Sequence, residues 1–337
     1  MRPLLLGPNQ PPDRFYRGGP RIAEFRGTPD TGDRTPEDWI ASTTVLTGDS
    51  SMGLTALEDG TLLRDAIAAD PEGWLGAEHV ARFGPDAMLL VKLLDPGQRL
   101  PVHAHPDRAF AAEHLGHAHG KAEAWFILEP GEIHLGLRRD VGREELLDIV
   151  ERQDTEALLG MLHRMTVAAG DAVFVPPGVL HATGEGVFLV EVQEPEDLSI
   201  LLEWRDFELD GVADGHLGLG FPVVIDAVDR VGHSADEAES WIARCREGEE
   251  LEGEVLPSEA APFFGLAHHD IRGSSALGAG FAVGVVISGE LVLETAHGGA
   301  LELHRGNTFV VPAAVGALRA VGEGRLLLCR PPHPATV

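Results

Sequence analysis

The segment Gly97-Gln-Arg-Leu-Pro-Val-His103-Ala-His105 places two histidines two positions apart. A later segment, Gly170-Asp-Ala-Val-Phe-Val-Pro176-Pro-Gly-Val-Leu-His181, ends on a third histidine after a Pro-Pro-Gly turn. In a β-strand, residues i and i+2 point to the same face, so His103 and His105 are expected to enter one interior together. The turn before His181 is expected to set the angle between two strands and to direct this imidazole inward as well.

Glu123 adds a carboxylate to these three imidazoles, at the start of the next apolar strand. Imidazole is the commonest metal ligand near neutral pH because it is largely deprotonated there. A lone His-x-His pair in a chain with 16 histidines is usually a surface feature, but here two segments carry fixed glycine and proline offsets. We therefore predict one divalent ion bound by His103, His105, Glu123 and His181, and this donor set suits zinc, iron, manganese or nickel.

The composition excludes several classes of partner. The 337 residues carry a formal charge of −28, which repels nucleic acid phosphates and anionic membranes. No stretch approaches the roughly 18–20 apolar residues of a membrane span, and the three-leucine run near the N-terminus is too short for a signal peptide. Cys245 and Cys329 are too far apart in sequence to suggest a metal motif or a disulfide framework. These features predict a cytoplasmic protein, and nothing in the sequence indicates its oligomeric state.

Frequent glycine and proline between short apolar runs predict a β-rich fold with many turns. Strands are expected at Met88–Leu94, Glu123–Leu128, Ile133–Leu137, Ala172–Val175 and Val187–Val192. Helices are expected at Leu62–Leu75, broken near Pro71, at Arg143–Met165, and around Ser234–Arg246. Asp206–Gly220 has the polar, glycine-rich composition of a linker.

A weak internal repeat relates the two halves of the chain. Gly170–Pro176 is matched by Gly306-Asn-Thr-Phe-Val-Val-Pro312, and each copy is followed by a glycine pair and an apolar strand. Such a repeat suggests two copies of one β-barrel. No histidine follows Pro312 as His181 follows Pro176, so the second copy is expected to lack a ligand set and to serve a structural role.

The two histidine segments resemble the two motifs of the cupin superfamily, although Glu123 lies 18 residues after His105 instead of about four. The resemblance implies a mainly β protein with two cupin (jelly-roll) barrels and a helical insertion at about 140–166. We expect a metal-binding domain over residues 1–210, a linker and helix over 211–255, and a degenerate barrel over 256–337.

Further segments resemble the type I phosphomannose isomerases, in particular their short bacterial forms. In chain order they are Tyr16-Arg-Gly-Gly19, Glu37-Asp-Trp-Ile-Ala-Ser-Thr43, Leu89-Leu-Val-Lys-Leu-Leu94, Pro101-Val-His-Ala-His-Pro-Asp107, Gly120-Lys-Ala-Glu-Ala-Trp125 and Val190-Glu-Val-Gln-Glu-Pro195. The similarity runs from about Arg14 to Trp204, and it depends on the shared order of these segments.

This resemblance implies one Zn²⁺ held by His105, Glu123 and His181, with His103 standing where many members have glutamine. Lys121 matches the family's substrate-site lysine, and Glu191 matches an acidic residue beside the metal. The alternatives without a role in the site are a solvated loop lysine for Lys121 and a barrel-edge ion pair for Glu191.

One position departs from the family pattern. The resemblance places a catalytic arginine ten residues after Glu191, where this chain has Leu201. Leucine cannot donate a hydrogen bond to a phosphate or an enediolate. Arg205 is the candidate replacement, although four residues of strand span roughly 13 Å. Arg108, Arg138 and Arg205 are the arginines considered for holding a phosphate beside Lys121.

The activity implied by the resemblance is the interconversion of mannose 6-phosphate and fructose 6-phosphate through a cis-enediol. Two alternatives stay open at the level of sequence. One is another metal-dependent cupin enzyme, such as an oxygenase or a different sugar isomerase. The other is a non-catalytic protein that binds a sugar phosphate.

Overall fold

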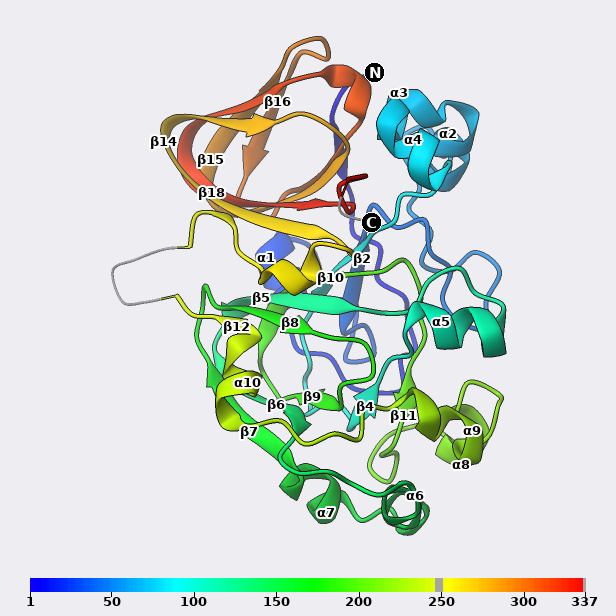
Figure 1. The fold of residues 1–337 in the computed structure, drawn as a ribbon. Helices are drawn as coiled ribbons and strands as arrows, with labels where there is room; N and C mark the ends of the chain where they lie inside the picture. The colour runs from blue at the N-terminus through cyan, green and yellow to red at the C-terminus, as the bar shows by residue number, and fades with distance from the viewer. Residues whose placement is uncertain (246–250, 336–337) are drawn as a thin grey trace.

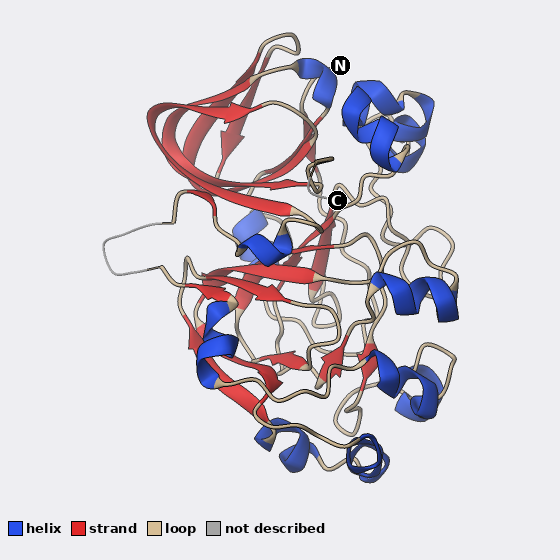
Figure 2. Ribbon diagram, viewed as in Figure 1, coloured by secondary structure: helices blue, strands red, loops and turns tan. Residues whose placement is uncertain are grey.

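The computed structural model describes residues 1–245 and 251–335, and within them the strands form three antiparallel sheets. Figure 1 shows the sheets in two β-rich units, with most of the chain up to β12 (Ile242–Ala243) in one and the segment from residue 253 onward in the other. Most helices lie around the outside of these units, whereas the helix Arg21–Arg26 lies between them (Figure 2). The predicted mainly β, cupin-like fold is therefore confirmed.

Two sheets face each other in the first unit. The six-stranded sheet has the order β12 (Ile242–Ala243), β8 (Ala172–Val175), β5 (Glu123–Glu129), β10 (Phe188–Gln193), β3 (Leu90–Leu94) and β2 (Glu37–Ile40). The five-stranded sheet has the order β11 (Ile200–Leu201), β4 (His103–Ala104), β9 (His181–Thr183), β6 (Gly131–Leu137) and β7 (Leu162–Val167). Apolar side chains from both sheets, including Ile127 and Leu135, pack between them. This face-to-face packing creates the interior in which the histidine segments meet.

The second unit is a single curved seven-stranded sheet around its own apolar core. Its order is β1 (Leu4–Leu6), β17 (Thr308–Val311), β15 (Ala282–Thr295), β18 (Leu318–Arg330), β14 (Gly265–Gly278) and β13 (Gly253–Glu254), with β16 (Ala300–His304) paired to β15. The repeated segment takes the same form in both units. A glycine at positive φ, Gly170 or Gly306, precedes a four-residue strand that ends before Pro176 or Pro312. This arrangement fits the two predicted barrels.

Three short strands lie outside the domains in which the sequence placed them. β1 comes from the first residues of the chain but pairs with β17 of the C-terminal sheet. β12 and β13 fall within the predicted linker, yet β12 pairs with β8 and β13 with β14. Strands of two or three residues show no readable periodicity, so only their tertiary partners define them. Residues 246–250 and 336–337 of the predicted linker and second barrel lie outside the described residues.

The helices are short and lie between or beside the strands. They are α1 (Arg21–Arg26), α2 (Leu63–Ala69), α3 (Pro71–Leu75), α4 (Ala77–Phe83), α5 (Arg108–Phe110), the π-helical turn η1 (Ala111–Leu115), α6 (Arg143–Arg152), α7 (Thr155–Gly160), α8 (Gly211–Asp214), α9 (Phe221–Val224) and α10 (Ala235–Ser240), with 3₁₀ turns η2 (Ile225–Ala227), η3 (Ser258–Ala260) and η4 (Ala313–Val315). The expected break at Pro71 is confirmed. Among the described residues, no helix has the length and apolar character needed to cross a membrane.

Two helix predictions were partly wrong. The expected helix Arg143–Met165 ends at Arg152, where Gln153 takes a left-handed conformation and Asp154 caps α7. Its last residues belong instead to β7, in which Met165 and Val167, two positions apart, pack on the same face against the interior cluster. The expected helix Ser234–Arg246 ends at Ser240, and Ile242–Ala243 adds to the sheet edge as β12. Residue 246 lies outside the described residues.

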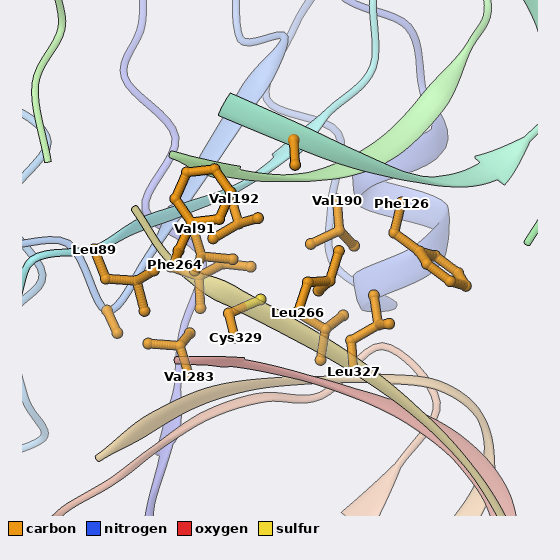
Figure 3. Packing of buried hydrophobic residues seen from close by; sticks show 14 of the residues in the cluster. Leu89, Val91, Phe126, Val190, Val192, Phe264, Leu266, Val283, Leu327 and Cys329 are labelled. Carbon is orange, nitrogen blue, oxygen red and sulfur yellow. The ribbon is translucent and has the colours of Figure 1, made fainter. Parts of the chain in front are cut away.

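The second unit packs on the outer face of the six-stranded sheet. Figure 3 shows the apolar side chains that meet there, with Leu89, Val91, Phe126, Val190 and Val192 on one side and Leu266, Val283, Leu327 and Cys329 on the other. Phe264, 1 % exposed, lies in the same cluster. The two units therefore share one continuous apolar core, while the opposite face of the six-stranded sheet is left to line the interior of the first unit.

We expect Leu327→Ala to lower the free energy of unfolding by about 2–5 kcal/mol, because it leaves a cavity in the core that joins the units. Denaturant unfolding followed by tryptophan fluorescence measures this, and Leu5→Ala at an exposed position is the matched control. Equal losses from both substitutions would contradict the proposed shared core.

Candidate metal centre

The four predicted ligands meet between the two sheets of the first unit. His103 on β4 and His181 on β9 are direct cross-strand partners, and both face the interior. Glu123 begins β5 on the opposite sheet. Its Oε2 atom lies 2.9 Å from His105 Nε2, and its Oε1 atom lies 3.1 Å from His181 Nε2. The three histidines form a buried cluster whose candidate ligand atoms lie within 4.8 Å of one another.

Glycine makes this convergence possible at two points. Gly178 has a φ of +84°, which favours glycine, and its backbone N–H donates to the carbonyl of His105 at 2.7 Å. The turn before His181 is thereby tied to the end of the His-x-His segment. A side chain at Gly97 would place Cβ 2.3 Å from the carbonyl oxygen of Gly18, so only glycine fits there.

Backbone carbonyls fix the orientation of all three imidazoles. The Nδ1 atoms lie at hydrogen-bond distance from carbonyl oxygens, His103 with Pro101 (2.8 Å), His105 with Leu198 (2.7 Å) and His181 with Val179 (2.9 Å). A carbonyl only accepts, so each Nδ1 is assigned the proton and each Nε2 presents a lone pair. The Nε2 atom of His181 is buried and has no hydrogen-bond partner among the described residues. This lone pair faces Glu123 Oε1 at 3.1 Å, an arrangement that a cation between the two atoms would stabilise, so the cluster fits a metal ion.

Lys121 supplies a positive charge at the edge of this cluster. Its Nζ atom lies 2.9 Å from both His105 Nε2 and Glu123 Oε2. Burial lowers the pKa of His105 to about 3, and Lys121 adds to this shift. Burial opposes ionisation of Glu123, but Lys121 and His105 outweigh it and hold the pKa of Glu123 well below its usual range. At neutral pH the donor set therefore contains neutral imidazole and an ionised carboxylate.

A second charged layer lies beside the cluster on the six-stranded sheet. Glu191 on β10 is the cross-strand partner of Lys92 on β3, which in turn opposes Trp39 on β2. Lys92 Nζ lies 3.4 Å from carboxylate oxygens of both Glu191 and Glu37. Burial raises the pKa of Glu191 to about 7, because Lys92 offsets the penalty only partly and Glu123 adds to it. Glu191 can therefore take up and release a proton near neutral pH.

The N-terminal segment contributes an arginine to the same site. Arg14 Nε lies 3.0 Å from Glu37 Oε1, the oxygen to which Tyr16 also donates. Arg14, Tyr16 and Lys92 line a cavity of about 50 Å³ that also contacts Lys121 and Glu191, the two matched site residues. Tyr16, Glu37 and Lys92 lie in segments that resemble the family, but no site role was predicted for them or for Arg14. A signal was present, because a lysine in the middle of the apolar stretch Leu89–Leu94 requires a buried partner.

The arginines expected to hold a phosphate lie elsewhere. Arg205 is exposed and donates through Nη2 to the carbonyl of Arg152 at 2.9 Å, away from the cavity. Arg108 pairs with Glu194 at 2.5 Å and lies over the ring of Phe263. Arg138 lines a separate groove. The structure thus does not bring Arg205 to the metal centre as the sequence suggested, because the chain turns away after β11.

Comparison with known proteins shows the family to which the chain belongs. A family described as mannose-6-phosphate isomerase, cupin domain, matches residues 257–331. A mannose-6-phosphate isomerase from Streptococcus mutans is 30% identical over 264 residues, which cover 76% of each chain. The chain belongs to the mannose-6-phosphate isomerase family.

Solved structures of this family share the fold over nearly the whole chain. The mannose 6-phosphate isomerase from Bacillus subtilis superposes with a TM-score of 0.75 at 23% identity and covers 98% of this chain and 100% of its own. A variant of phosphomannose isomerase from Salmonella typhimurium gives a TM-score of 0.76 at 16% identity, covering 99% and 100%. The resemblance to type I phosphomannose isomerases is therefore confirmed.

Glu37→Gln should destabilise the protein by about 3–5 kcal/mol, because it leaves Arg14 and Lys92 buried without their shared carboxylate. Burial opposes the charge on Glu37, but Arg14 and Lys92 outweigh it and lower its pKa. This carboxylate thus stabilises the fold above the unfolded pKa of about 4.3, and its contribution is lost as pH falls further.

Urea unfolding at a series of acidic pH values measures both effects. The acid-dependent loss of stability should be shallower in Glu37→Gln than in the native protein. Glu58→Gln, at an exposed ion pair with Arg2, is the control and should change stability by less than about 0.5 kcal/mol. An unchanged acid profile in Glu37→Gln would rule out this role for Glu37.

Proposed function

We propose that the protein is a metal-dependent isomerase that interconverts mannose 6-phosphate and fructose 6-phosphate through a cis-enediol. The observation that carries the proposal is the position of Glu123, which faces His105 and His181 across the interior while Lys121 and Glu191 stand beside it. The names of the relatives support the same reaction.

His103, His105, Glu123 and His181 are the proposed ligands of one Zn²⁺ per chain. The fit rests on the three Nε2 lone pairs, which the Nδ1 hydrogen bonds direct away from the backbone. A bound divalent ion would supply Lewis acidity, which polarises a carbonyl and stabilises an enediolate. We propose a cytoplasmic location for this chemistry.

Glu191 is the proposed base that moves the proton between C2 and C1 of the sugar. Its pKa of about 7 lets the carboxylate accept a proton from one carbon and return it to the other. Lys92 holds the carboxylate in place from the neighbouring strand. No net proton is gained or lost, because the group that accepts the proton also donates it.

Lys121 and Arg14 are the proposed positive groups for substrate oxygens, in place of Arg205. Arg14 is held by Glu37 at 3.0 Å and lies 3.9 Å from Asp197, so its guanidinium is preorganised. The cavity of about 50 Å³ admits only the reacting end of a hexose phosphate. Phe15 and Leu100 also line it.

Leu201 favours one alternative function, another metal-dependent cupin enzyme with a different substrate. Leu201 on β11 is the cross-strand partner of His103 on β4, and its apolar side chain lines the cavity. Bound iron in place of zinc would point to an oxygenase. Binding of a sugar phosphate without turnover would point to a non-catalytic role.

The native protein should contain about one zinc per chain by mass spectrometry, and a coupled assay should show conversion of mannose 6-phosphate. His181→Ala removes one of four ligands and should abolish both. His297→Ala, in an exposed turn of the second unit, should retain both. Turnover that survives in metal-free protein would exclude the proposed metal dependence.

Glu191→Gln should lower kcat by about 10²–10⁴-fold because the amide cannot accept the proton. In the native protein kcat should rise as pH increases through about 7, since the carboxylate form is the active one. Glu129→Gln, at the exposed end of β5, is the matched control. A Glu191→Gln enzyme with the native pH profile and near-native kcat would assign proton transfer to another group.

A further inference from the structure

A groove lined by five arginines lies on the outer side of the five-stranded sheet. It runs between β6 and β7 and the connection from α6 to α7, which lie next to one another in Figure 1, and encloses about 1070 Å³. The arginines are Arg99, Arg138, Arg152, Arg164 and Arg205. This concentration is unusual in a chain that has 54 acidic and only 26 basic residues.

The groove is separate from the metal centre. His181 on β9 opposes Leu135 on β6, and both point into the interior of the first unit. The adjacent residue His134 lines the groove and therefore points to the opposite face of the same sheet. One sheet thus separates the two sites.

Three of the five arginines in the groove are paired with carboxylates. Within the described residues the ion pairs are Arg99 with Glu203, Arg164 with Glu132 at 2.6 Å, and Arg152 with Asp148 at 2.9 Å and Asp154 at 3.7 Å. Glu156 also lines the groove. The guanidinium of Arg205 bonds only to the carbonyl of Arg152, and the side chain of Arg138 has no hydrogen bond or ion pair in the described part of the chain. Two guanidinium groups therefore face the groove without a paired carboxylate.

A buried imidazole in the same groove lacks a partner. His134 is 7% exposed, and its Nδ1 atom has no hydrogen-bond partner among the residues described. Its cross-strand neighbour on β7 is Arg164. Burial lowers the pKa of His134, so the ring is neutral at pH 7. A buried polar atom without a partner is costly, and a ligand can relieve that cost.

We propose that this groove binds a small phosphate-bearing anion, a phosphate ester or a diphosphate, at a site distinct from the metal centre. Planar guanidinium groups match the oxygens of phosphate in pairs, and Arg138 and Arg205 are available for this. The volume accommodates a molecule the size of a nucleotide. The overall charge of −28 opposes the approach of nucleic acid or of a second copy of the chain, whereas a small anion is held by direct contact with these two guanidinium groups.

Calorimetric titration of the metal-loaded protein with ADP at about 0.15 M ionic strength tests the site, with inorganic phosphate as the smaller probe. Arg138→Gln combined with Arg205→Gln should weaken ADP binding at least about tenfold. Arg64→Gln combined with Arg319→Gln removes the same formal charge at exposed ion pairs elsewhere. This control pair should leave the affinity within about twofold, because distant surface charges are screened.

Two results would overturn the proposal. One is the absence of binding by the native protein, or equal weakening by the two double variants, which would leave only a general charge effect. The other is loss of ADP binding in His181→Ala, which would place the anion at the metal centre. Binding that persists in His181→Ala supports the groove even if that variant or the native protein fails to isomerise mannose 6-phosphate.

Discussion

The contact on which the site depends is the one between Glu123 and the imidazoles of His105 and His181. A carboxylate buried between two sheets is costly unless opposite charge and hydrogen bonds surround it. Lys121 and Trp125 supply hydrogen bonds to Glu123, and the two imidazoles present their Nε2 atoms to it. The interior of the first unit is thus polar around Glu123, and apolar side chains pack around this polar cluster.

The charges next to this contact alternate in sign. Arg14, Glu37, Lys92 and Glu191 form a buried chain in which each group has an oppositely charged neighbour. Of the two carboxylates in this chain of charges, Glu191 has too little positive charge nearby to offset its burial. Its pKa rises to about 7 as a result. The same arrangement that stabilises the other three groups therefore leaves one carboxylate able to exchange a proton, which is the property a proton-transfer enzyme needs.

The repeated segment Gly306–Pro312 has a structural role in the second unit, although it lacks the histidine that follows Pro176. The second unit covers the outer face of the six-stranded sheet, so that every residue of β3 and of β10 is buried. Val190 faces the second unit, whereas Lys92 and Glu191 face the site. Leu94 and Leu189 lie on the same inner face as these two charged groups. The glycine and proline of the second copy form the strand and its turn, which this packing requires, and among the described residues the second unit has no cluster of metal-ligating side chains.

The sequence by itself determined the parts of this protein that depend on local geometry. The i, i+2 spacing of His103 and His105, the turn before His181 and the strand that begins at Glu123 each follow from a few neighbouring residues. The main strands of the first unit and the break at Pro71 were predicted for the same reason, whereas the long strands β14 and β15 of the second unit were not predicted. Tertiary structure decided which distant segments share a sheet or a cavity. It brought Arg14 and Glu37 to Lys92, placed β1 in the C-terminal sheet and turned Arg205 away from the metal centre. These outcomes depend on the pairing of strands far apart in the chain, and no local pattern of residues encodes that pairing.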